Sequence, residues 1–141
     1  MSACLLGIPC RYNNKGKVNQ KAITIFLNNS CLAICPEVIA GLPTPRPACE
    51  IKGGDGHDVL TGKAKVVDKQ GKDYSQDFIK GAQKCLDIIK KAGIKEVILK
   101  SGSPSCGAVH IYDGSFSDHK INGQGVFAAL LQKHGIRIRE L

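Results

Sequence analysis

The segment from Val97 to Gly107, VILKSGSPSCG, joins a short apolar run to a turn that carries one thiol and three hydroxyl groups. Residues 97–99 are typical of a buried strand, and the Gly, Pro and Ser residues that follow disfavour both helix and strand. Open α/β sheets bind their ligands beyond the carboxyl ends of the strands. We therefore expect a functional site at Ser101–Gly107, which includes Cys106, rather than a plain surface turn.

Strands and helices alternate on both sides of this segment. Strands are predicted at 2–6, 31–35, 95–100 and 136–138, and helices at 18–27, 73–92 and 126–134. This order predicts an α/β fold with an open, largely parallel sheet and flanking helices, similar to a Rossmann fold. The length of 141 residues suits a single domain that covers residues 1–141 and buries a real core.

The best-defined helix is the one at 73–92. Its apolar stripe, which assigns Cys85 to the core, consists of Phe78, Ala82, Cys85, Leu86 and Ile89. Asp73 and Gln76 resemble a capping box at its start, and Gly93 suits its end. Short strands are also expected at 59–60, 64–67 and 109–112, and the stretch at 113–125 is expected to be a loop long enough to act as a lid.

Composition and charge narrow the class of protein. The chain has 43% hydrophobic residues and no apolar run close to the roughly 20 residues of a membrane span. No basic region precedes the first apolar residues, so no signal peptide is expected and the protein is predicted to be cytoplasmic. Seven unevenly spaced cysteines in such a compartment argue against a disulfide scaffold. The net charge of +8 favours an anionic partner such as a nucleotide phosphate or RNA, or simply reflects solvated lysines.

Side chains that can bind a metal or take part in catalysis follow several predicted strands or lie in the loops after these strands. Cys10, Glu37, Cys49, Ser101 and Cys106 share this position, so they are expected to meet at one edge of the sheet. Arg46, in a stiff proline-rich loop, is a candidate for binding phosphate or carboxylate. Cys4 lies inside the first predicted strand and is expected to pack in the core.

Three thiols on three separate loops suit a metal better than a disulfide. Structural zinc usually takes four ligands in close pairs, but C-x-x-C is absent and the four histidines show no ligand spacing. An iron–sulfur cluster normally takes four cysteines, so three would leave one iron open to substrate as a Lewis acid. A thiol nucleophile at Cys106 is a comparable alternative, although no histidine lies in an obvious partner position.

Longer motifs give a more specific indication. They are SACLLGIPCRY at 2–12, CPEV at 35–38, GLPTPRP at 41–47, SPSCG at 103–107 and IYDGSF at 111–116. Together they closely resemble the thiouracil desulfidase (TudS) family over nearly the whole chain. The resemblance implies a 4Fe-4S cluster held by Cys10, Cys49 and Cys106, and catalytic roles for Glu37 and Ser101. Many related sequences carry Ala at the position of Cys49, so its presence here supports the desulfidase branch.

The function implied is the non-redox desulfuration of a thiolated pyrimidine, namely 4-thiouracil, 4-thiouridine or its monophosphate, with release of hydrosulfide. The thione sulfur would bind the open iron while Glu37, with Ser101, activates water for attack on the ring carbon. Arg46, Ser103 and Ser105 are expected to bind the substrate. The alternatives are 4-thiouridine in transfer RNA, a non-enzymatic cluster or sulfur carrier, and a zinc or metal-free nucleotide-binding domain. The sequence does not define the oligomeric state.

Overall fold

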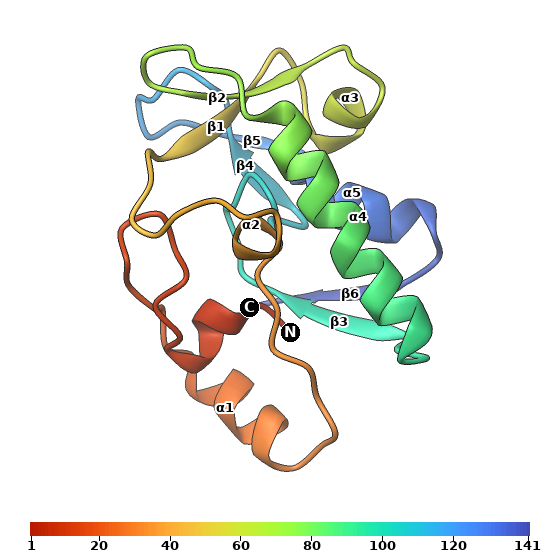
Figure 1. Cartoon of the computed structure of the whole chain (residues 1–141). Coiled ribbons are helices and arrows are strands. Elements are labelled where there is room, and N and C mark those ends of the chain that lie inside the picture. Colours follow the sequence, from red (N-terminus) through yellow and green to blue (C-terminus); the bar gives the residue numbers. More distant parts are fainter.

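The structure, a computed structural model, describes all residues of the chain, 1–141. The helices are η1, a 3-10 helix (Ala3–Leu6), α1 (Gln20–Leu27), α2 (Pro36–Ile39), α3 (Gly56–Leu60), α4 (Ser75–Lys91) and α5 (Val126–Lys133). The strands are β1 (Cys49–Lys52), β2 (Lys65–Asp68), β3 (Glu96–Leu99), β4 (His110–Tyr112), β5 (Lys120–Asn122) and β6 (Arg137–Glu140). They form one parallel pair, β3–β6, and two antiparallel pairs, β1–β2 and β4–β5 (Figure 1). None of the helices combines the length and hydrophobicity needed to cross a membrane.

The parallel part of the fold is organised around β3. It pairs with β6 along its whole length. On its other side, the Ser2 N–H donates to the Ile98 carbonyl at 2.8 Å, and Ser2 forms a parallel bridge with Ile34. Four segments that are distant in the sequence therefore lie side by side. The α/β class and the presence of a parallel sheet are as predicted, whereas the two antiparallel pairs leave fewer parallel strands than expected.

The first two predicted strands are wrong in extent. Of residues 2–6 and 31–35, only Ser2 and Ile34 take part in pairing, and the chain after Ser2 winds into η1. A five-residue apolar run fits a buried helical turn as well as a buried strand, so periodicity alone does not separate the two. Gly7 ends η1 with φ +87°, a left-handed conformation that favours glycine.

Three local predictions also need correction. Residues 59–60 lie in α3 and not in a strand, because Asp55 caps that helix at its N-terminus. The stretch at 113–125 is not a continuous loop, since it contains β5, which pairs with β4. The expected capping box at Asp73 does not form, and Asp73 instead accepts a hydrogen bond from the Ser75 N–H at 2.8 Å.

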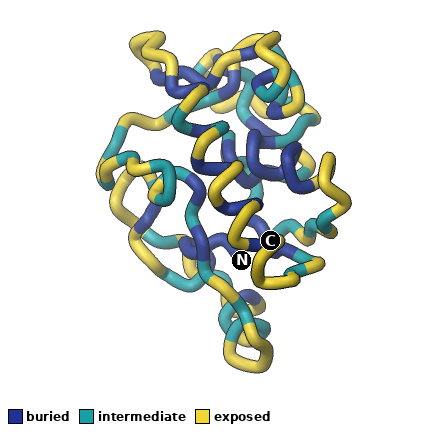
Figure 2. Tube along the Cα trace, turned by 45° about the vertical axis from the view of Figure 1, so that its right-hand side comes forward, coloured by how far each residue is buried: buried dark blue, intermediate teal, exposed yellow.

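The main core lies between α4, α5 and the strands. The predicted stripe of α4, including Cys85, is fully buried, and Figure 2 shows the buried positions gathered in the middle of the trace. α4 contacts both α2 and α5. Gly81 allows the close approach to α2, because a Cβ at this position would lie 2.1 Å from the Pro36 carbonyl oxygen. The long helix therefore fixes the position of α2, which carries Glu37.

Candidate functional site

The loops beyond β3, η1 and the first turn of α2 surround one cavity of about 440 Å³. Its walls contain six of the eight side chains predicted for the site, namely Cys10, Glu37, Arg46, Cys49, Ser103 and Cys106. Ser101 and Ser105 lie next to the cavity in sequence but are not part of its walls. The positions reached from the ends of β3 and the neighbouring segments thus converge, as expected for the edge of an α/β sheet.

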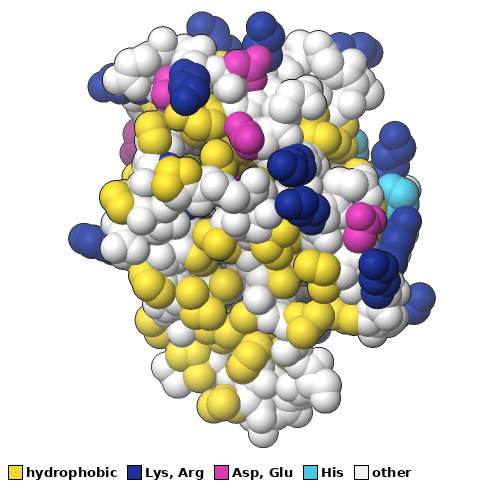
Figure 3. All heavy atoms as spheres, viewed as in Figure 1, with side chains coloured by type: hydrophobic (Ala, Val, Ile, Leu, Met, Phe, Trp, Pro, Cys, Tyr) yellow, Lys and Arg dark blue, Asp and Glu magenta, His cyan; other side chains and the backbone are white.

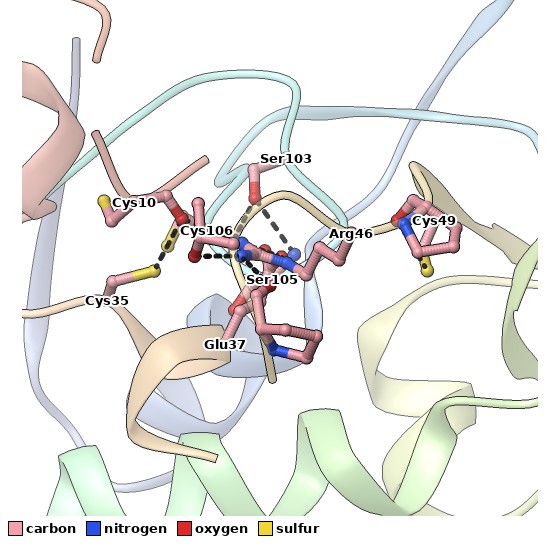
Figure 4. Close-up of polar contacts among 11 residues, drawn as sticks. Cys10, Cys35, Glu37, Arg46, Cys49, Ser103, Ser105 and Cys106 are labelled. Atoms are coloured by element: carbon pink, nitrogen blue, oxygen red, sulfur yellow. Dashed lines mark hydrogen bonds and ion pairs between the residues drawn. The ribbon is translucent and has the colours of Figure 1, made fainter. Parts of the chain in front are cut away.

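The three predicted cluster ligands come from three separate segments of the chain. Cys10 follows η1, Cys49 opens β1 and Cys106 lies in the turn after β3. All three thiols are free, and Cys10 and Cys106 are buried. In Figure 4, Cys10 and Cys106 lie on one side of the Arg46 side chain and Cys49 lies on the other. The thiols thus line the cavity from separate directions instead of converging on one point.

This spread bears on the kind of metal group that the residues can hold. No three His, Cys, Asp or Glu side chains lie close enough together to bind a single metal ion. A 4Fe-4S cluster is larger, and its iron atoms take one thiolate each at different corners of a cube. Three thiols around one cavity, with no histidine on its walls, therefore fit such a cluster better than a zinc ion.

The protonation of these thiols gives a second test of whether they can hold such a cluster. Burial raises the pKa of Cys106 to about 12, and burial, followed by the Glu37 charge, raises the pKa of Cys49 to about 12. A bound cation reverses this preference, because a thiol that coordinates a metal loses its proton. Ser105 next to Cys106 is buried, and its Oγ has no hydrogen-bond partner. A free hydroxyl beside a predicted cluster ligand is suited to donate to a cluster sulfur.

Glu37 and Arg46 form a largely buried ion pair in the cavity wall. The Glu37 Oε2 accepts from the Arg46 Nε at 2.8 Å and lies 2.6 Å from its Nη2 (Figure 4). Arg46 also donates from Nη2 to the Cys10 carbonyl at 2.9 Å, and from Nη1 to Pro43 and Thr44 at 3.2 Å. Its side chain is only 4% exposed. Arg46 therefore joins the carboxylate, the Cys10 loop and its own proline-rich loop into one unit.

This arrangement differs from the substrate contact predicted for Arg46. A guanidinium has five N–H donors, and Arg46 makes four hydrogen bonds within the protein besides the ion-pair contact of its Nη2 with Glu37. The contact of Arg46 with the substrate stays a prediction. Sequence reasoning could not find the pair, because Glu37 in α2 and Arg46 in the proline-rich loop meet only through the fold.

The three predicted serines occupy different environments. The Ser103 Oγ accepts from the backbone N–H groups of Ser105 and Cys106, each at 3.1 Å, and so shapes the turn that presents Cys106. Ser101 lies at the end of β3, where its N–H donates to the Leu141 carbonyl at 3.0 Å. Substrate contacts by these serines, and the catalytic role of Ser101, remain predictions.

Two further thiols lie beside Cys10. Cys4, expected in the core, packs against Cys10 and Cys35 and also lines the cavity. The Cys35 Sγ donates to the Cys10 carbonyl at 3.8 Å, and hydrogen bonding with Cys10, together with burial, raises the pKa of the Cys35 thiol. Sequence reasoning assigned neither to the site. The sequence signal that could have indicated Cys35 was its position directly before Pro36, where α2 begins at the edge of the cavity.

Comparison with known proteins now identifies the family. The family model for 2-thiouracil desulfurase matches residues 1–140. The chain belongs to the 2-thiouracil desulfurase family. An uncharacterized protein of Bacillus subtilis (strain 168), YbbK, is 44% identical over 138 residues, which cover 98% of this chain and 91% of that protein. The predicted family is thereby confirmed, and with it the prediction that the chain is an enzyme.

A solved structure agrees with this assignment. It is described as the 4Fe-4S-dependent thiouracil desulfidase TudS. It superposes with a TM-score of 0.85 at 40% sequence identity, and the match covers 99% of this desulfurase-family chain and 87% of TudS. Fold and family therefore agree over nearly the whole length of both proteins.

Proposed function

We propose that this protein removes sulfur from a thiolated pyrimidine with the help of a 4Fe-4S cluster held by Cys10, Cys49 and Cys106. The observation that carries the proposal is that three free thiols from three loops line one cavity together with a carboxylate. Membership of the 2-thiouracil desulfurase family and the 40% identity to TudS support the substrate class and the cofactor.

The cluster, when bound, supplies an iron with an open coordination position that acts as a Lewis acid toward the soft thione sulfur. The overall reaction is hydrolytic: a thiocarbonyl and water give a carbonyl and hydrogen sulfide, and no electrons are transferred to or from the pyrimidine. The protein must therefore activate a water molecule and exclude others. Glu37, on the cavity wall, takes the proton of the attacking water as a general base.

Arg46 acts in this scheme as a positioning residue. Its Nε and Nη2 hold one oxygen of Glu37, Oε2, and no hydrogen bond engages the other carboxylate oxygen. The same guanidinium holds the carbonyl of Cys10. The base and one cluster ligand are therefore fixed relative to each other, which keeps the attacking water at a constant distance from the bound substrate. Ser101, predicted as a second catalytic group, would have to reach the cavity from just outside its walls.

The cavity volume suits a small molecule. About 440 Å³ lies within the range of roughly 300–1,000 Å³ that is typical of small-molecule sites.

Thiolated RNA is a second substrate to be tested, because the net charge of +8 favours an anionic partner. On the face shown in Figure 3, however, Lys and Arg side chains lie as separate groups, mostly in the upper half and on the right-hand side, and hydrophobic side chains cover much of the lower half.

Sulfide release by anaerobically reconstituted protein tests the proposal. We expect sulfide, with loss of the thione absorbance, from at least one of 2-thiouracil, 4-thiouracil and 4-thiouridine monophosphate, and none from cluster-free protein. No sulfide from any of them would favour the cluster-carrier alternative. Activity confined to thiolated transfer RNA, with a steep decrease in binding as salt rises, would assign the substrate to RNA.

A further inference from the structure

The hairpin formed by β4 and β5 carries the motif IYDGSF at 111–116, which contains no predicted cluster ligand or catalytic residue. β4 contacts β1, so the hairpin lies beside the strand that begins with Cys49 (Figure 1). Ile111 is fully buried in the main core, whereas Tyr112 and Phe116 line the cavity. The motif therefore connects the core to the cavity and places two aromatic residues in the cavity wall.

The aromatic residues of the chain are divided between the hydrophobic core and this cavity. Four of them pack in the hydrophobic clusters, namely Phe26, Tyr74, Phe78 and Phe127. The other three, Tyr12, Tyr112 and Phe116, line the cavity. A cation lies 5.7 Å from the ring centre of Tyr12, and another lies 5.3 Å from that of Tyr112. Phe116 is therefore the aromatic residue of the cavity wall whose ring has no cation beside it.

Phe116 has a backbone conformation that is unfavourable for its residue type. Its φ of +57° lies in the left-handed region, where a bulky side chain is rare. Such a conformation persists only where surrounding contacts hold it, and residues of this kind cluster at ligand sites. Gly114 allows the hairpin to approach β1 closely, because a Cβ at this position would lie 2.7 Å from the Ile51 carbonyl oxygen. The packing against β1 thus helps to hold the turn that contains Phe116.

Glu50 provides the polar contact that holds this conformation. Its Oε2 accepts from the backbone N–H groups of Gly114 and Phe116, at 2.9 and 3.1 Å. None of the ion pairs of the structure involves Glu50, so no cation competes for its carboxylate. Hydrogen bonds from N–H groups to a carboxylate are about twice as strong as those between neutral groups. Because Glu50 directly follows Cys49 in β1, it fixes Phe116 relative to a predicted cluster ligand.

We propose that the ring of Phe116 contacts the pyrimidine bound in the cavity, and that Glu50 is the positioning residue that holds Phe116 there. This inference rests on the proposed function and adds to it a residue that touches the substrate. The face of a pyrimidine ring has no hydrogen-bonding groups, so an aromatic side chain is a suitable partner for it. Such a contact tolerates different substituents at the edge of the pyrimidine. Phe116 therefore contributes affinity for the ring and not the choice between sulfur and oxygen.

A double-mutant cycle with Glu50→Ala and Phe116→Ala in the holoenzyme tests whether Glu50 acts through the ring. Phe116→Ala should raise KM for 4-thiouracil about tenfold, with kcat within about twofold of wild type and unchanged iron content. Glu50→Ala should raise KM less, and the double variant should not exceed Phe116→Ala. Glu50→Gln should stay close to wild type, because its amide oxygen can still accept from both N–H groups. Glu96→Ala removes a carboxylate of β3 outside the cavity wall and should not change KM.

Phe116→Gly separates the ring contact from a purely structural role. Glycine adopts a positive φ readily, so denaturant unfolding should show this variant to be at least as stable as Phe116→Ala. Because the ring is absent, KM for 4-thiouracil should still be about tenfold above wild type. A return of KM to the wild-type value would show that the residue only shapes the turn and would overturn the proposal. Additive losses in the double-mutant cycle would overturn it as well.

Binding of uracil to the same holoenzyme variants, measured by calorimetry, does not depend on turnover. Weaker binding in Phe116→Ala and Glu50→Ala, with wild-type affinity in Glu96→Ala, supports the contact even if no thiolated pyrimidine is desulfurated. Equal affinity for uracil in all of these proteins would overturn it. Hydrogen exchange reports on the Glu50 contact itself, because the Gly114 and Phe116 amides should exchange faster in Glu50→Ala. Unchanged exchange at both amides would overturn the positioning role of Glu50.

Discussion

Cys85 in the helical core and Cys106 in the cavity are buried thiols with similar acidity but different surroundings. Burial raises the pKa of each to about 12. Cys85 packs among the apolar side chains of α4, and no polar group approaches it by a hydrogen bond. Cys106 lies in a serine-rich turn, on the wall of a cavity with other thiols, an ion pair and unpaired cations. Burial alone therefore does not distinguish a structural cysteine from a proposed cluster ligand, whereas the neighbouring groups do.

The largest expected effect comes from replacing each of these two cysteines by alanine in separate variants. Cys106→Ala should yield protein without the cluster and lower sulfide release below detection, because a 4Fe-4S cluster with only two protein ligands is not retained. Cys85→Ala should keep the cluster and the activity, and lower the free energy of unfolding by about 1 kcal/mol. Visible absorbance and sulfide release measure both. A brown, active Cys106→Ala protein would contradict the assignment of this ligand.

Glu37→Gln separates cluster binding from chemistry. The amide oxygen can still accept from Arg46, so the loops should stay in place, whereas the amide cannot take a proton from water. We expect turnover to fall about 10²- to 10⁴-fold with unchanged iron content. Steady-state kinetics and iron analysis of the same preparation provide the check. Full turnover in this variant would remove Glu37 from the mechanism.

Gly81→Ala tests whether the packing of α4 against α2 in the core affects the position of Glu37 in the site. The new Cβ would lie 2.1 Å from the Pro36 carbonyl oxygen, so α2 and Glu37 must move away from α4. We expect a loss of about 1–3 kcal/mol in the free energy of unfolding together with a several-fold loss of turnover. Lys84→Ala, on the exposed side of the same helix, is the matched control. Reduced stability with normal turnover would show that the site tolerates a shift of α2.

The smallest expected effect is on how the stability of the cluster-free protein depends on pH. The pKa of Cys85 is raised from its ordinary value of 9 to about 12, so the folded state favours the neutral thiol. Its contribution to stability is complete below pH 9 and is lost as the pH rises toward 12. Denaturant unfolding should therefore show falling stability of the apoprotein over this window, and a shallower decline in Cys85→Ala. Identical pH profiles for the two proteins would show that Cys85 does not contribute to this loss.

The sequence predicted the core better than the details of the loops. α4, α5, β3 and β6 lie close to their predicted positions, because their apolar periodicity and terminal glycines reflect the packing directly. Residues 2–6 were misassigned because a short apolar run fits strand or helix equally well. In that region, one bridge at Ser2 and the turn at Gly7 decide the outcome, and neither has a strong sequence signal.

The composition of the cavity wall was also predictable in part. The rule that ligands bind at strand ends predicted that the three candidate thiols and Glu37 lie close together. All four line one cavity. The ion pair of Arg46 was not predictable, because it depends on how the proline-rich loop folds against α2.

Iron and acid-labile sulfide per chain, measured anaerobically in reconstituted wild type, Cys106→Ala and Cys85→Ala, test whether Cys106 holds a 4Fe-4S cluster. We expect about four of each in wild type and in Cys85→Ala, and close to none in Cys106→Ala. Stoichiometric zinc without sulfide in the wild type, or equal iron and sulfide in all three proteins, would contradict it.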